Sequence, residues 1–148
     1  MPHFTLQFGA EGPVVTAMIG PSGPRLLALV AAKRPVPTMV QIRALIDTGA
    51  TCTCVDPSVL KQIGSTPTGK ALVHTPTTAG VPQQVDQHDI SLAIPGATPS
   101  TPPLAVPTLA VTEHVLAVQG IQALIGRDVL SACLLTYNGS MNLVTLCY

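Results

Sequence analysis

The chain has 148 residues, a length that fits a single domain spanning residues 1–148 with a substantial core. Seven basic and seven acidic residues cancel, and the largest basic cluster is the pair Lys33 and Arg34, which argues against a nucleic-acid or membrane partner. The longest apolar run, residues 26–32, is too short to span a bilayer, and the first residues do not follow a signal-peptide pattern, so we expect a cytoplasmic protein.

The composition predicts an all-β fold. Hydrophobic residues make up 47% of the chain, against 9% charged and 3% aromatic residues. The apolar residues are mainly Val, Leu, Ile and Ala in short runs between 15 prolines and 12 glycines. This punctuation is typical of a small closed barrel or a sandwich.

The first half of the chain predicts strands at residues 4–8, 14–19 and 26–32, the last two joined by a turn at 20–24 as a hairpin. A strand at 39–46 should lead into Asp47, and a strand at 51–55 should lead away from it. A short helix follows at 56–64, with Asp56 as its N-cap, Pro57 at its first position and Gly64 just past its end.

The second half predicts a hairpin over residues 71–94, although Pro76 and Pro82 interrupt its ladder. Residues 95–107 should form an exposed loop, followed by strands at 109–118 and 121–125. A short helix that includes 129–133 should then begin near Asp128. The Asn-Gly pair at 138–139 predicts a last hairpin, whose second strand is 143–148.

Residues 44–50 read Ala-Leu-Ile-Asp-Thr-Gly-Ala, an apolar run that delivers the carboxylate of Asp47 into a turn. A carboxylate at the end of an apolar strand needs hydrogen-bond donors or a protonated partner. No other Asp-Thr-Gly or Asp-Ser-Gly occurs in the chain, so an equivalent carboxylate would have to come from a second copy. The alternative is a plain Asx turn, in which Asp47 bonds its own downstream backbone and Gly49 takes a positive φ.

A second segment, residues 123–130, reads Ala-Leu-Ile-Gly-Arg-Asp-Val-Leu. Together the two segments resemble the active-site signature of the retropepsin-like family, the single-domain, retroviral-type aspartic peptidases. The resemblance implies an all-β, single-lobe closed barrel with one or two short helices, and a C2 homodimer because one lobe carries half an active site. It assigns catalysis to Asp47, the active-site loop to Thr48, Gly49 and Ala50, and a supporting loop to Ile125, Gly126, Arg127 and Asp128.

The resemblance also assigns roles outside these two loops. A peptidase of this type needs a hairpin that covers the substrate, and we place its tip, the flap, at Thr77, Thr78, Ala79 and Gly80. An ordinary polar loop is the alternative there. The terminal strands, 143–148 with 1–8, would lie at the subunit interface, unless the last hairpin packs inside its own subunit.

One position departs from the family pattern. Retroviral enzymes usually place an acidic residue shortly after the Gly-Ala of the motif, where it pairs with the arginine of the supporting loop. Thr51 and Cys52 occupy that region here. Arg127 should therefore find Asp56, Asp128 or a backbone carbonyl instead.

The cysteines and histidines do not indicate another chemistry. Cys52, Cys54, Cys133 and Cys147 are expected to be free, buried thiols, and no metal or other cofactor is predicted. We interpret His74, His88 and His114 as surface or flap polar groups. A Cys/His hydrolase would need one of them to activate Cys52 or Cys54.

The sequence thus favours a homodimeric aspartic endopeptidase that hydrolyses extended peptides or polyproteins. Two carboxylates that share one proton offer an acid and a base together, which amide hydrolysis by water requires. The main alternative is a non-catalytic binding or assembly module that keeps the fold. A further alternative is a subunit that becomes active only within a longer polyprotein.

Overall fold

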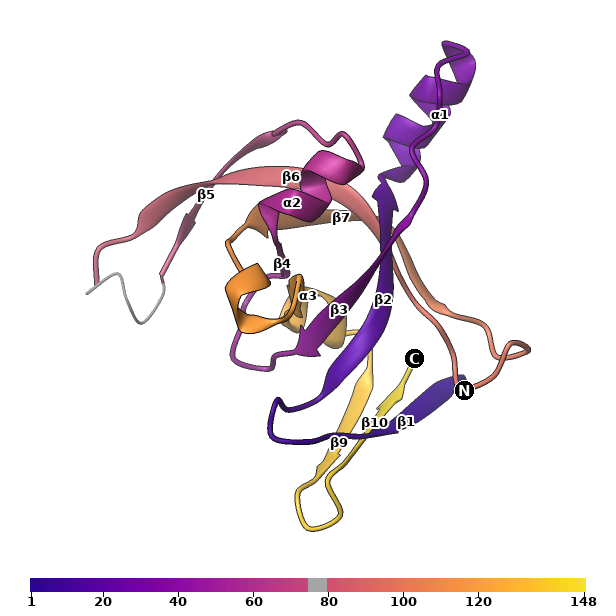
Figure 1. The fold of residues 1–148 in the computed structure, drawn as a ribbon, viewed down its shortest axis with the longest axis vertical. Coiled ribbons are helices and arrows are strands. Elements are labelled where there is room, and N and C mark those ends of the chain that lie inside the picture. Colours follow the sequence, from indigo (N-terminus) through magenta and orange to yellow (C-terminus); the bar gives the residue numbers. More distant parts are fainter. Residues whose placement is uncertain (75–79) are drawn as a thin grey trace.

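The computed structural model describes residues 1–74 and 80–148, and its central feature is a closed barrel (Figure 1). Six strands form the ring in the order β2 (Val14–Pro21), β3 (Val40–Ile46), β8 (Ala123–Ile125), β4 (Cys54–Val55), β7 (Leu104–Glu113) and β6 (Gln83–Ile94). Pairing between β2 and β6 closes the ring, and β5 (Gly69–Val73) pairs with the N-terminal part of β6. The predicted all-β barrel is confirmed.

The barrel closes around the inward face of its strands. Alternate residues of β2, β3 and β6 are buried, as expected for strands with one face towards a core. The fully buried barrel residues include Ile19, Ala44, Ile90, Val111 and Ile125. At about 25 cal/mol per Å² of apolar surface, burial of this face is the main stabilising contribution to the fold.

A separate three-stranded sheet lies below the barrel in Figure 1, in the order β1 (His3–Gln7), β10 (Leu143–Cys147) and β9 (Leu134–Asn138). Its inner face contributes Phe4, Val144 and Leu146 to the same core. The predicted last hairpin is confirmed, because β9 and β10 pair antiparallel within the subunit. Both terminal strands are therefore neighbours in one chain.

One predicted strand is wrong. Residues 26–32 belong to helix α1 (Gly23–Ala31), which projects from the barrel at the upper right of Figure 1. Pro24 sits in its first turn, and a run of Leu and Ala favours a helix over a strand. An apolar run of this length does not distinguish the two structures by periodicity.

The other helices are short. The predicted helix after Asp56 is confirmed as α2 (Pro57–Gln62), and the one near Asp128 as α3 (Arg127–Leu130), with Gly126 rather than Asp128 at its N-cap. A 3-10 turn, η2 (Ala117–Gln119), replaces the end of the strand predicted at 109–118. Among residues 1–74 and 80–148, no helix is long and apolar enough to cross a membrane.

The predicted loop at 95–107 is shorter than expected, because β7 begins at Leu104 and includes Pro107. Proline lacks the N–H that a ladder needs. The register between β6 and β7 shifts between Ile90 and Leu92, so a bulge accommodates Pro107 in the strand. The strand predicted at 51–55 is likewise reduced to β4, two residues long.

The predicted hairpin over residues 71–94 is confirmed as β5 and β6. The flap positions Thr77, Thr78 and Ala79 lie outside the described residues. Gly80 is described, with a φ of 82° that favours glycine.

Candidate active site

Asp47 begins the loop that leaves the barrel after β3. Ile46 is buried in the barrel, and the N–H of Asp47 donates to the carbonyl of Ile125 at 3.0 Å, which ties the start of the loop to β8. The carboxylate is half-buried. Its Oδ1 accepts a hydrogen bond from the N–H of Gly49 at 2.8 Å.

The hydrogen bond from the Gly49 N–H to Asp47 Oδ1 forms an Asx turn, which was the alternative interpretation of the motif. The positive φ predicted with it for Gly49 is wrong, since among the described glycines only 12, 64, 80 and 120 have one. The turn uses one carboxylate oxygen. Within the part of the chain that the structure describes, Oδ2 has no hydrogen-bond partner, so the group can still receive a ligand.

The turn between β8 and α3 packs directly beneath this loop. A Cβ built on Gly126 would lie 2.6 Å from the carbonyl carbon of Cys52 and 2.9 Å from the nitrogen of Thr53. Only glycine fits such a backbone contact. The N–H of Gly126 donates to Thr53 Oγ1 at 3.1 Å, and the N–H of Arg127 donates to the carbonyl of Ala50 at 3.0 Å. The structure thus brings the two sequence segments together.

Arg127 reaches across to the Asp47 loop. Its guanidinium donates to the carbonyl of Thr48 at 3.3 Å and to Thr51 Oγ1 at 3.0 Å. Of the three partners proposed from the sequence, the backbone carbonyl is the one observed, while Asp56 and Asp128 bind elsewhere. Thr51 is an additional partner that the sequence analysis missed, although it stands in the region where the family usually has an acid.

Asp128 fixes the other side of the loop. Its two oxygens accept hydrogen bonds from the backbone N–H of Thr53 at 2.8 Å and from the hydroxyl of Thr53 at 2.7 Å. The same carboxylate accepts from the N–H of Val129 at 2.9 Å, within α3. A charged acceptor with donors on both sides holds the two loops in one register.

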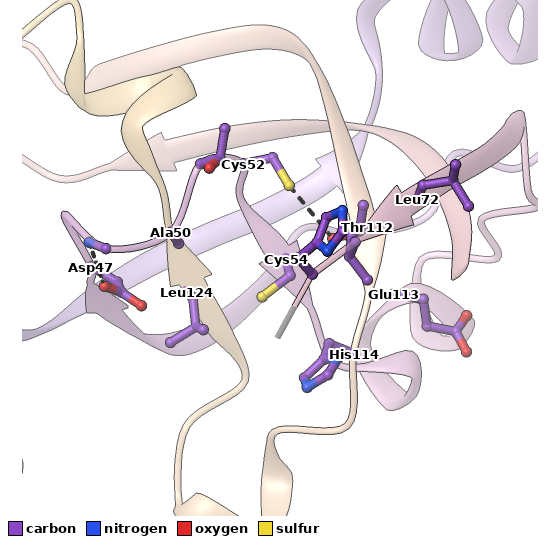
Figure 2. A pocket seen from close by; sticks show the side chains of 13 residues that line it. Asp47, Ala50, Cys52, Cys54, Leu72, Thr112, Glu113, His114 and Leu124 are labelled. Carbon is purple, nitrogen blue, oxygen red and sulfur yellow. Dashed lines mark hydrogen bonds between the residues drawn. The ribbon is translucent and has the colours of Figure 1, made fainter. Parts of the chain in front are cut away.

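A cavity of about 660 Å³ opens beside Asp47 (Figure 2). The Asp47 loop forms one wall and β5 lies on another side, while β4, β7, β8 and the histidines that follow β5 and β7 contribute the rest. Its lining is mostly apolar with a few polar groups, as is usual for a ligand site. The lining residues outside the Asp47 loop are Cys54, Leu72, Val73, His74, Thr112, Glu113, His114 and Leu124.

Of the two thiols next to this cavity, that of Cys54 is a poor nucleophile. Cys54 is buried, and burial raises the pKa of its thiol to about 11. The thiol is therefore protonated at neutral pH and a weak nucleophile. The Sγ of Cys52 lies 3.9 Å from Thr112 Oγ1, so its contact is with a hydroxyl.

Asp56 does more than cap α2. Besides the N–H and hydroxyl of Ser58, it accepts hydrogen bonds from the N–H groups of Leu116 and Ala117, both at 2.8 Å. Burial of the carboxylate would raise its pKa, but these four donors lower the pKa to about 2. Asp56 thus ties α2 to the segment after His114, at the rim of the cavity.

The interpretation of His88 as a surface or flap group is wrong. Its side chain is buried, Nδ1 lies 3.0 Å from Ser65 Oγ, and Nε2 lies 3.4 Å from a carboxylate oxygen of Glu113. The signal was in the sequence, because His88 has the same parity along β6 as Ile90 and Leu92, which face the core. His74 and His114 are exposed and line the cavity.

Residues 39–137 match the model of the aspartyl protease family. This chain belongs to that family. The match covers both loops described above. No curated protein matches the chain in sequence.

The chain also resembles solved structures. A retropepsin-like aspartic protease from Rickettsia conorii superposes with a TM-score of 0.58 at 12% sequence identity, covering 99% of this chain and 90% of that one. The retroviral protease-like domain of Ddi1 from Leishmania major gives a TM-score of 0.39 at 16% identity, covering 71% of this chain and 78% of that chain. The first similarity supports a retropepsin-like fold.

Proposed function

We propose that this aspartyl protease family member is an endopeptidase, active as a homodimer in which Asp47 of each chain supplies one of two catalytic carboxylates. The observation that carries the proposal is the geometry of Asp47. One carboxylate oxygen is held by Gly49, and the carboxylate borders a cavity of about 660 Å³. The chain contributes a single carboxylate in this motif, so the second comes from its copy.

The proposed chemistry needs two carboxylates close to each other that share one proton. The ionised member takes a proton from a water molecule, whose oxygen attacks the carbonyl carbon of the scissile amide. The protonated member donates to the carbonyl oxygen. As the C–N bond breaks, the amide nitrogen takes up a proton from the pair. A hydroxyl group of the diol intermediate returns a proton to the pair as the new carboxyl group forms, which restores the starting state.

The surrounding residues have roles in this proposal that agree with their positions. Thr48 is exposed, and its hydroxyl makes no hydrogen bond within residues 1–74 and 80–148, which suits a contact with the loop of the second copy. Gly49 lacks a side chain where a substrate backbone would approach. Ala50 completes the turn, and the loop from Ile125 to Asp128 fixes its position.

The cavity predicts the kind of substrate. Leu72, Leu124 and Cys54 give it an apolar lining, and β5 extends along one side. We therefore propose extended peptides with apolar side chains around the scissile bond. The β5–β6 hairpin, the flap of this proposal, would cover the bound peptide and exclude water.

The test is Asp47→Asn, which keeps the size of the side chain and the Gly49 hydrogen bond but removes the ionisable group. Purified protein is incubated with a mixed peptide library from acidic to neutral pH, and the cuts are identified by mass spectrometry. We expect the variant to lose at least about 100-fold in turnover while it stays folded and dimeric. Asp89→Asn, an aspartate of β6 outside the cavity lining, is the matched control and should cut like the wild type.

Cleavage that survives Asp47→Asn would refute the proposal. A wild-type chain that binds peptides without cutting them at any pH, with binding unchanged by the substitution, would instead support the non-catalytic module.

A further inference from the structure

The sheet formed by the chain termini has one open edge. Its middle strand, β10, pairs with β1 on one side and with β9 on the other, so both of its edges are occupied inside one subunit. Within the part of the chain that the structure describes, β9 pairs with β10 alone, and no further backbone hydrogen bond involves residues 134–137. The terminal strands therefore leave β9 as an edge that a second chain can extend.

The apolar inner face of this sheet is only partly covered at that edge, where the ring of Phe8 lies 4.8 Å from the ring of Tyr137. Residues opposite each other in an antiparallel pair share a face, so Leu135 and Tyr137 of β9 lie on the same face as Leu146 and Val144. Val144 and Leu146 are 0% exposed, whereas Tyr137, at the edge, is 60% exposed. At the opposite edge, Phe4 of β1 is only 7% exposed. The core is thus complete on the β1 side and incomplete on the β9 side.

The edge also lacks the usual protection against pairing. Exposed edge strands of soluble proteins usually carry charges, prolines or inward-pointing polar groups. Residues 131–148 contain no Lys, Arg, Asp, Glu or Pro. An unprotected edge beside exposed apolar side chains is typical of a natural interface.

We propose that β9 is the dimer seam of this protein, where it pairs antiparallel with β9 of a second copy across the molecular twofold and joins two three-stranded sheets into one. This inference rests on the proposed function, because the second copy is the occupant that the single Asp47 requires. In Figure 1, β9 lies on the left of its sheet, the same side of the molecule as the Asp47 loop and the β5–β6 hairpin.

The register follows from the alternation of faces. If the inner face is to continue across the seam, paired residues must have the same parity, so the twofold passes through a residue position. Thr136 is the middle residue of β9. Centring the pair there sets Leu135 against Tyr137 of the second copy and covers the exposed ring.

The first experiment places a charge on the inner face of the edge. Tyr137→Lys should raise the dimer dissociation constant at least about 10-fold in sedimentation, and peptidase activity should fall in parallel at fixed protein concentration. Leu27→Lys is the matched control, because Leu27 is 71% exposed on α1. It should keep both dimer and activity. Circular dichroism checks that each variant folds.

The second experiment uses a covalent crosslink and does not depend on a destabilising variant. In a twofold pair centred on Thr136, the Cα atoms of the two copies of residue 136 lie about 4.5–5.5 Å apart, within disulfide range. Thr136→Cys should therefore give a disulfide dimer under mild oxidation. Thr5→Cys is the control with the same number of thiols, because Thr5 lies on the same face of the sheet but in β1, at the other edge.

The outcomes separate this proposal from the proposed function. A crosslink through Thr5→Cys but not Thr136→Cys, or a dimer unchanged by Tyr137→Lys, overturns the seam at β9 and leaves the shared catalytic pair intact. A β9-linked dimer that cuts no peptide supports the seam and refutes the peptidase. A wild-type chain that is monomeric at every concentration overturns the seam.

Discussion

The Asp56 carboxylate accepts four hydrogen bonds, which lower its pKa from the usual 3.8 to about 2. Because the folded pKa lies below the unfolded one, the carboxylate stabilises the fold fully above pH 3.8. That contribution disappears as the pH falls towards 2. A shift of this size corresponds to about 2 kcal/mol.

Asp56→Asn should therefore lower the free energy of unfolding at pH 7 by about 2 kcal/mol, since a neutral amide is a weaker acceptor and its NH₂ group cannot accept at all. Urea unfolding at several pH values measures the effect. The difference from the wild type should shrink between pH 4 and pH 2. A difference that stays constant over this range would contradict the assigned role of the charge, and Asp89→Asn is the control.

Single residues also show where sequence reasoning stops. The cap at Asp56 was predicted correctly because its local pattern carries the signal. Arg127 was assigned a choice of partners but not Thr51, since a partner across 76 positions depends on how two loops meet. His88 was misassigned because its polarity was given more weight than its place in the alternation of β6.

At the scale of elements, the site depends on the packing of the Asp47 loop against the turn between β8 and α3. Gly126 has a φ of −89°, which any residue can adopt, so glycine is required there by space and not by backbone conformation. The backbone of Cys52 and Thr53 occupies the position of a Cβ. Any side chain at residue 126 must push the two loops apart.

Gly126→Ala should destabilise the protein by about 1–3 kcal/mol, in line with overpacked cores, and should reduce kcat/KM by shifting Asp47. Thermal unfolding and peptide hydrolysis measure the two effects. Gly9→Ala is the matched control, because a Cβ there meets no atom within 4 Å. A Gly126→Ala variant with wild-type activity would show that the position of the Asp47 loop does not depend on this contact.

The elements themselves were predictable where alternation and turn residues agreed, as for β3, β6, α2 and the last hairpin. The error at α1 has a physical cause. An isolated apolar run of seven residues, 26–32, does not distinguish a strand from a helix by periodicity, so the signals for a helix were Pro24 in the first turn and the Leu and Ala content of the run. The bulge at Pro107 could not be predicted from the sequence either, because a proline by itself predicts the end of a strand.

At the scale of the whole molecule, a closed barrel was predictable from the sequence, but the pairing of its strands was not. The parallel pairing of β3 with β8 joins residues 44–46 to 123–125, and it brings the Asp47 loop and the turn between β8 and α3 to one end of the barrel. No local pattern encodes that pairing. The sequence analysis did not predict it, and the structure shows its cause in the apolar faces that the ring encloses.

The central claim is that two copies of Asp47 act together. If so, a dimer with one Asp47→Asn subunit is inactive, and mixing changes activity by the statistics of pairing. Wild type and Asp47→Asn are mixed at fixed total concentration, allowed to exchange subunits, and assayed on a peptide that the wild type cuts. An equal mixture should retain about a quarter of the wild-type activity, because about one dimer in four carries both carboxylates. Retention of about half would mean that each chain works alone, and would contradict the shared catalytic pair.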